Sequence, residues 1–172
     1  MSPSSADELV ARYDASGAEI GSALRTDVRA QGLWHAAAVV LVRSTDGSQA
    51  YVHLRTADKD VFPGLHDCWA GGVVAAGETP AQCARRELAE ELGIIDVTPR
   101  PLFTLVYDQP PQRCHNFTFE VHSDGPVRPQ PEEIVSGGWM PMDELRDWAN
   151  DPTSPLVPDG RYTIQEWFRR YG

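Results

Sequence analysis

The sequence predicts one mixed domain of the α/β or α+β class, in which helices surround a sheet. Short apolar or alternating runs typical of strands are interspersed with a few segments of helical periodicity along the 172 residues. Apolar residues make up 41% of the chain, which is enough for one core of ordinary size. Mixed strands with helices around them form layered domains. We therefore expect residues 1–172 to be a single domain.

The N-terminal region is expected to hold a tail, a hairpin extension and a central strand. Residues 1–7 are expected to be a loose tail. Within the extension, residues 8–33, the runs ELVARYD and AEIGSAL flank a short turn at residues 15–17, as in a β-hairpin. The nearly continuous apolar run 34–42 is typical of a strand buried in the middle of a sheet.

Further strands are expected on both sides of one clear helix, with two more helices near the C-terminus. The turn and loop signals that separate them are Asp46-Gly47, Phe62-Pro63-Gly64 and the Pro-rich run DQPPQ. The predicted elements are strands at 49–56, 68–74, 101–108 and 115–122, a loop at 128–133, a short strand or bend at 134–141, and helices at 142–150 and 163–171.

The clear helix is predicted over Pro80–Leu92. Thr79 is a good N-cap, Pro80 suits the first helical position, and Gln82 completes a capping box. Gly93 is a natural C-terminal stop. At 100° per residue one stripe is apolar and is expected to be the buried face, namely Ala81, Ala84, Leu88 and Leu92.

The opposite flank of this helix carries three carboxylates, Glu87, Glu90 and Glu91. Glu87 and Glu91 form a like-charge i,i+4 pair, which costs roughly 0.2–0.5 kcal/mol. Acids in the last turn also oppose the helix dipole, by roughly 0.3–1 kcal/mol each. A solvated, salt-bridged face is the simpler alternative, but Arg86 alone cannot balance three acids. A bound Mg²⁺ or Mn²⁺ would instead turn the repulsion into ligation.

The residues around these acids complete a motif that resembles the Nudix box, G-x5-E-x7-R-E-U-x-E-E-x-G-U, with U aliphatic. The matching residues are Gly72, Glu78 and the run from Arg86 to Ile94. All nine specified positions match, and a chance match in such a chain is on the order of 10⁻⁷. The resemblance implies the fold of the Nudix hydrolase superfamily, an α/β/α sandwich with a mixed central sheet and a loop-helix-loop catalytic motif.

The resemblance also implies an activity: hydrolysis of a phosphoanhydride in a nucleoside diphosphate derivative or a related organic pyrophosphate. Mg²⁺ is the implied cofactor, with Mn²⁺ able to replace it. Glu87, Glu90 and Glu91 would be its ligands, together with the carbonyl of Gly72, and Arg86 would orient Glu90 or Glu78.

The sequence leaves three possibilities for the general base. In many family members a Glu from a loop outside the box activates water. Glu133 is our first choice here and Glu132 the second, since both lie in the loop RPQPEE. The third possibility is one of the box's own acids, Glu87 or Glu90.

Outside the box, the chain resembles the branch of the superfamily that is similar to isopentenyl diphosphate isomerase. By this resemblance Arg55 and Lys59 would hold the diphosphate. Gly71 and Val73 stand where the isomerases have a Cys and a metal-binding His, so isomerase chemistry is disfavoured as the alternative. His35 matches another isomerase histidine, but a packing or hydrogen-bonding role is expected here. A non-catalytic nucleotide-binding domain is a third alternative, disfavoured because no box carboxylate is lost.

Composition narrows the class of partner. The net charge of −10 argues against a nucleic-acid polymer, but not against a small phosphorylated substrate, because a bound cation changes the local charge. No run of about 18 apolar residues and no signal peptide is present, so neither a membrane partner nor secretion is expected. We expect a soluble, cytoplasmic protein, and the sequence leaves a homodimer open.

The cysteines and aromatic residues give weaker indications. Three cysteines without CxxC spacing (Cys68, Cys83 and Cys114) favour free thiols over a disulfide framework or a zinc site. Four aromatic residues could stack on a nucleobase, although strand aromatics are more often part of the core: Trp34, Trp69, Tyr107 and Phe117. The identity of the substrate depends on variable loops that the motif does not specify.

Overall fold

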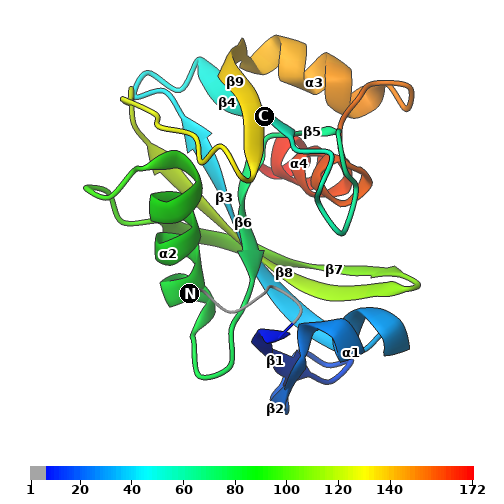
Figure 1. Cartoon of the computed structure of the whole chain (residues 1–172). Coiled ribbons are helices and arrows are strands. Elements are labelled where there is room, and N and C mark those ends of the chain that lie inside the picture. Colours follow the sequence, from blue (N-terminus) through cyan, green and yellow to red (C-terminus); the bar gives the residue numbers. More distant parts are fainter. Residues whose placement is uncertain (1–6) are drawn as a thin grey trace.

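The structure is a computed structural model and describes residues 7–172. Within these residues nine strands form one curled mixed sheet (Figure 1). The strands are β1 (Leu9–Tyr13), β2 (Glu19–Leu24), β3 (Trp34–Arg43), β4 (Gln49–Arg55), β5 (His66–Asp67), β6 (Trp69–Val73), β7 (Arg100–Gln109), β8 (Gln112–His122) and β9 (Ile134–Pro141). The mixed α+β class predicted from the sequence is confirmed.

The central strand is β3, the run that the sequence predicts to be buried. It pairs in parallel with β8 and antiparallel with β6, and its end continues into the hairpin with β4. Its side chains alternate between two cores. Val40 packs into the core shared with Leu88 of α2 (Pro80–Leu92), whereas Leu41 packs into the core shared with Leu145 and Ile164. A strand buried on both faces has no room for polar residues, which explains its near-continuous apolar run.

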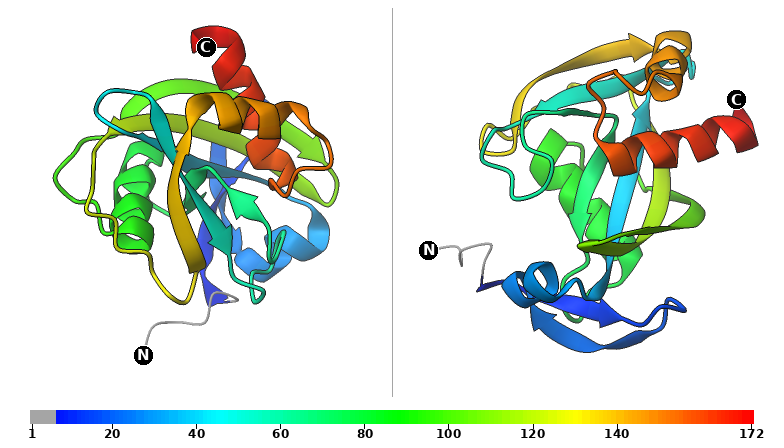
Figure 2. Two further views of the ribbon diagram at one scale, coloured as in Figure 1. Left: turned by 90° about the horizontal axis from the view of Figure 1, so that it is seen from above. Right: turned by 90° about the vertical axis from the view of Figure 1, so that its right-hand side faces the viewer.

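Helices cover both sides of this sheet. Helix α2 packs on β3 and β6, and its boundaries, capping box and left-handed C-cap glycine agree with the prediction. Helices α3 (Met142–Asn150) and α4 (Pro158–Tyr171) pack together on the other side (Figure 2). No helix within residues 7–172 is long and apolar enough to cross a membrane.

Three details differ from the sequence-based expectation. Helix α1 (Arg25–Gln31), which ends at a left-handed Gly32, was not predicted, because only Val28 in it is buried and no apolar stripe marks it. Helix α4 begins at Pro158 rather than at residue 163, since a proline at the first position starts the helix. On α2 the buried face is rotated, so that Ala81 is exposed and Cys83 is buried instead.

The N-terminal hairpin forms as predicted. Strands β1 and β2 pair antiparallel, and β1 joins the main sheet at Arg12, opposite His35. The hairpin leads into α1, which lies beside the cleft described below. The three cysteines are free and buried, in agreement with the expectation of unpaired thiols.

Candidate functional site

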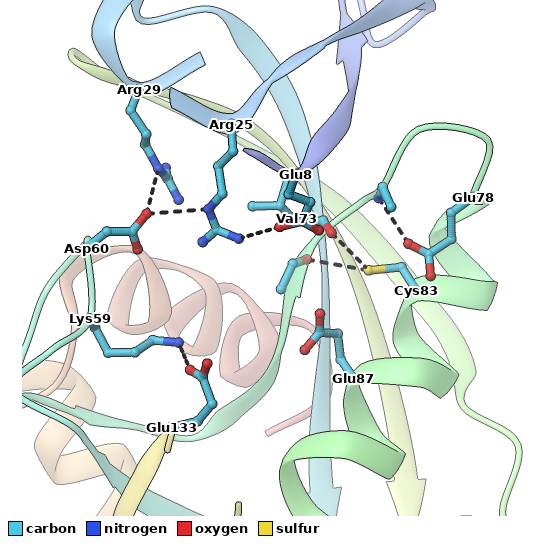
Figure 3. Close-up of polar contacts among 12 residues, drawn as sticks. Glu8, Arg25, Arg29, Lys59, Asp60, Val73, Glu78, Cys83, Glu87 and Glu133 are labelled. Atoms are coloured by element: carbon cyan, nitrogen blue, oxygen red, sulfur yellow. Dashed lines mark hydrogen bonds and ion pairs between the residues drawn. The ribbon is translucent and has the colours of Figure 1, made fainter. Parts of the chain in front are cut away.

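A cleft of about 410 Å³ lies between α2 and the loops that follow β4 and precede β9 (Figure 3). One wall is the acidic flank of α2 together with the backbone of Gly71 and Gly72 on β6. The opposite wall includes Lys59 and Glu133. The structure therefore brings the predicted carboxylates, the predicted glycine and the first-choice base to one cleft.

Arg86 holds the neighbouring carboxylates in place through hydrogen bonds. Its Nε and Nη2 donate to the two oxygens of Glu78 at 2.8 and 3.0 Å, a bidentate pair. Its Nη1 donates to Glu87 Oε1 at 2.7 Å and to Glu90 Oε2 at 3.3 Å. The expected contacts with Glu78 and Glu90 are thus present, and Glu87 is an additional partner. Glu90 itself is 54% exposed at the rim of the cleft.

Glu91 is the most buried of the three acids, although the helical wheel places it on a polar flank. It is 7% exposed, and its Oε2 accepts a hydrogen bond from the Gly71 amide at 3.3 Å. Burial, and next the neighbouring Glu87, raise the pKa of Glu91 to about 8. Burial also raises the pKa of Glu87. A helical wheel considers α2 alone. It therefore cannot show that Glu91 is buried where the helix packs against Gly71 and Gly72 of β6.

This burial gives a prediction for the metal-free protein. Glu91 in the folded state holds a proton that the unfolded chain releases, because its folded pKa of about 8 exceeds the ordinary 4.5. The free energy of unfolding in EDTA should therefore decrease through this group as the pH rises from 4.5 to 8. Urea denaturation of wild type and Glu91→Gln at pH 5 and pH 8 measures it. The variant should be the less pH-dependent of the two, and equal pH dependence would contradict the raised pKa.

Gly72 faces the Glu87 carboxylate directly. A Cβ at this position would overlap the Glu87 Oε1 and Cδ atoms, so only glycine leaves the carboxylate where it is. The Gly72 carbonyl accepts a weak hydrogen bond from Cys83 Sγ at 3.5 Å. Because Gly72 has no side chain, a small ligand could contact both its backbone and the Glu87 carboxylate.

The other wall of the cleft carries the candidate bases. Glu133 forms an ion pair with Lys59 on this wall, away from Glu87 (Figure 3). Glu132 is exposed and does not line the cleft, and its backbone carbonyl accepts from Thr56 Oγ1 at 3.4 Å. Of the two candidates outside the box, only Glu133 is therefore in the cleft.

Arg55, unlike Lys59, does not line the acidic cleft. Its Nη2 and Nε donate to the carbonyls of Val61 and Phe62 at 2.8 and 3.3 Å, so it braces the loop after β4. It lines a second, deeper cavity of about 100 Å³ that meets the acidic cleft at Gly71, Gly72 and Lys59.

The deeper cavity contains residues that the sequence analysis did not single out. Asp67 and Asp159 line it, and burial followed by the neighbouring Asp159 raises the pKa of Asp67 to about 7. Arg25 and Arg29 reach it from α1. No motif marks these four positions, because they come from three separate parts of the chain and meet only in the folded protein.

His35 and the aromatic residues behave mostly as expected of core residues. His35 is buried, its Nδ1 lies 3.1 Å from the Leu33 carbonyl, and burial lowers its pKa to about 4. Trp69 is buried and donates from Nε1 to the Gly160 carbonyl. Trp34 stacks on His115. Tyr107 differs, since it lines an apolar pocket of about 530 Å³.

The donor set at the acidic wall suits a hard divalent cation. Carboxylate and backbone carbonyl oxygens are the ligands that Mg²⁺ and Mn²⁺ prefer. Burial, and next the neighbouring Glu87, raise the pKa of Glu91, and a bound cation would favour its ionised form. Within residues 7–172 no three acidic, imidazole or thiol groups already form a metal-binding cluster, and Arg86 and the Gly71 amide hold some of the carboxylate oxygens. Ligation would need these oxygens to turn toward the cation.

Comparisons with known proteins agree with this fold. The NUDIX domain model matches residues 33–160. The uncharacterized Nudix hydrolase orf19 of Rhodococcus erythropolis is 48% identical over 171 residues, covering 94% of this chain and 92% of that protein. The uncharacterized Nudix hydrolase SCO1686 of Streptomyces coelicolor is 40% identical over 164 residues, covering 91% and 86%.

Solved structures show the same fold. The crystal structure of DR0079 from Deinococcus radiodurans has a TM-score of 0.77 at 26% identity, covering 96% of this chain and 100% of that one. The crystal structure of a MutT protein from Methanosarcina mazei Go1 has a TM-score of 0.68 at 17% identity, covering 80% and 94%. The latter supports the fold alone.

This chain belongs to the Nudix hydrolases. It is therefore an enzyme of a family whose general activity is that of a pyrophosphohydrolase. The family acts on small phosphorylated molecules and generally uses divalent metals such as Mg²⁺.

Proposed function

We propose that the protein hydrolyses a phosphoanhydride in a nucleoside diphosphate derivative or a related organic pyrophosphate, with Mg²⁺ as cofactor and Mn²⁺ able to replace it. The observation that carries the proposal is the buried pair Glu87 and Glu91, which faces the bare backbone of Gly71 and Gly72 in a cleft. Burying carboxylates lowers the stability of the fold unless a positive charge compensates them, so these acids favour a bound cation as their partner.

Each residue of the acidic wall has a role in this proposal. Glu87 and Glu91 would hold the cation, with Glu90 and the Gly72 carbonyl as further ligands. The bound cation would supply charge neutralisation for the phosphates and a water of lowered pKa. Arg86 positions Glu87 and Glu90 through its hydrogen bonds and so fixes the acidic wall before the substrate binds.

The opposite wall would bind the substrate and accept the proton. Lys59 lines the cleft and would contact the diphosphate there, whereas Arg55 would act from the adjoining cavity. Glu133 is the base that we favour, because it alone of the two loop acids lines the cleft. Its ion pair with Lys59 holds its carboxylate in the cleft, where a base could reach a bound water. A diphosphate that attracts Lys59 would release Glu133 toward the water.

The test is a screen of nucleoside di- and triphosphates, dinucleotides, nucleotide sugars and isopentenyl diphosphate, with Mg²⁺ or Mn²⁺. We expect phosphate or nucleoside monophosphate release from at least one of them, abolished by EDTA. Isomerisation of isopentenyl diphosphate without hydrolysis of any compound would contradict the proposal. Binding without turnover across the whole panel would do the same and favour a non-catalytic domain.

Metal binding should also appear as stabilisation. A cation that binds the folded carboxylates and not the unfolded chain raises the melting temperature by mass action. We expect a higher melting temperature in millimolar Mg²⁺ than in EDTA at matched ionic strength, and a smaller response in Glu91→Gln. Equal melting of the wild type in both conditions would count against the site.

A further inference from the structure

Two arginines of the N-terminal extension converge on one oxygen atom at the edge of the cleft. Arg25 Nε lies 3.4 Å and Arg29 Nε 3.3 Å from Oδ2 of Asp60 (Figure 3). The two arginines are one turn apart on α1, so their side chains point the same way. Two guanidinium groups around one oxygen form a geometry that suits an anion.

Other contacts fix the two arginines in this position. Arg25 Nη1 donates to Glu8 Oε2 at 3.1 Å, and Arg29 Nη1 donates to Gln112 Oε1 at 2.9 Å. Both side chains are mostly buried, with 21% and 25% exposure, whereas Asp60 is 47% exposed. The arginine pair is therefore preformed, and Asp60, its present partner, is the more solvent-exposed side of the contact.

Asp60 lies on the loop that also carries Lys59, and the two neighbours pair with different elements. Lys59 pairs with Glu133, while Asp60 pairs with α1. The loop contains Phe62 in the left-handed region, with φ of 50°, which is unfavourable for a bulky side chain. Three ion pairs therefore hold this loop in place despite a strained backbone.

We propose that Arg25 and Arg29 form a second anion site that takes a phosphate group of the substrate, and that Asp60 occupies this site until the phosphate displaces it. The inference rests on the proposed function for the identity of the anion as a substrate phosphate. Arg25 lines both the acidic cleft and the deeper cavity, so a phosphate held there is next to the proposed diphosphate position. A dianionic phosphate with three acceptor oxygens competes well with a single aspartate oxygen for two guanidinium groups.

The space beyond Arg29 is suited to the rest of the substrate. Arg29 and Asp60 also line the apolar pocket of about 530 Å³, which contains Phe62, Tyr107 and Pro110. A phosphate bound by Arg29 can therefore carry an organic substituent that extends into this pocket. The N-terminal extension, which the family model at residues 33–160 does not include, would thereby complete the substrate site.

The test uses inorganic phosphate as the probe and EDTA in the buffer, so that neither metal binding nor turnover contributes. Titration calorimetry of the full-length protein should give a measurable dissociation constant for the wild type. The double variant Arg25→Gln/Arg29→Gln should bind phosphate roughly ten- to a hundredfold more weakly, as expected for lost charge-assisted hydrogen bonds. Arg169→Gln is the matched control, an exposed arginine paired with Glu166 on α4, and should bind like the wild type.

Asp60→Asn is the decisive variant, because the proposal and a purely structural role predict different changes in the affinity for phosphate. If Asp60 competes with phosphate, its neutralisation should tighten phosphate binding by roughly tenfold, the equivalent of one ion pair. If Asp60 only supports the loop, its loss should weaken binding or leave it unchanged, and either result overturns the proposal. Wild-type affinity in the double arginine variant would overturn it too, as would the absence of phosphate binding in Asp60→Asn. None of these results depends on hydrolysis, so a failed activity screen would refute the proposed function separately.

Discussion

Glu91→Gln should lower kcat/KM on the best substrate by more than about a hundredfold while the protein stays folded. Glu91 is the most buried acid of the cleft, and burial together with the neighbouring Glu87 raises its pKa. An amide oxygen in its place is uncharged and a poor ligand for a hard cation. Because a ligand of the metal acts on the transition state, the loss should be in kcat as well as in kcat/KM.

The stability of the same variant distinguishes a role in the reaction from a role in folding. Above pH 4.5 the metal-free wild type must take up a proton at Glu91, or bury its charge, when it folds, and glutamine removes this cost. Glu91→Gln should therefore melt at the same temperature as the wild type in EDTA, or higher. Glu19→Gln, on the exposed strand β2, is a charge-matched control that should leave activity unchanged. A loss of activity below about tenfold, which is less than ~1.4 kcal/mol, would show that Glu91 is not a ligand.

The sequence predicts most of the fold because its signals are local. Pro80–Leu92 has a capping box at one end and a left-handed glycine at the other, and the observed helix has the same bounds. The central strand β3 is nearly continuous in apolar residues because cores lie on both of its faces. Helix α1 lacks such signals, since it has one buried residue and no side-chain cap. A short polar helix is held by its neighbours, which a single sequence does not show.

The candidate site, like the fold, was predicted from the sequence only where its signals are local. The Nudix motif indicates the acids because their spacing along one helix is fixed by its geometry, and it indicates Gly72 as a position before that helix. The motif does not indicate Arg25, Asp60 or Asp67, which come from separate segments and meet only through the sheet. The burial of Glu91 was also missed, since it depends on how closely α2 approaches β6. That distance is set by two glycines on a different element.

Gly72→Ala should abolish hydrolysis although the change adds only one methyl group. The added Cβ would overlap the Glu87 carboxylate, which is the flexible end of a side chain and can turn away. The backbone should therefore remain intact, while Glu87 leaves the position in which it faces Glu91 and the Gly72 carbonyl. We expect a decrease in kcat/KM of about a hundredfold or more, of the size seen when the positioning of ligands is lost, and a loss of the Mg²⁺-dependent rise in melting temperature.

Two other glycines serve as controls for this variant. Gly138→Ala, on β9, adds a methyl group with nothing within 4 Å and should change neither activity nor stability. Gly71→Ala places its Cβ against the backbone of Ala38 and Val39, which cannot move aside, so it should destabilise the fold by about 1–3 kcal/mol or more. Gly72→Ala should melt close to Gly138→Ala in EDTA and yet differ from it in activity. If Gly72→Ala retained wild-type kcat/KM and its response to Mg²⁺, then the contact between Gly72 and Glu87 would have no part in holding the cation.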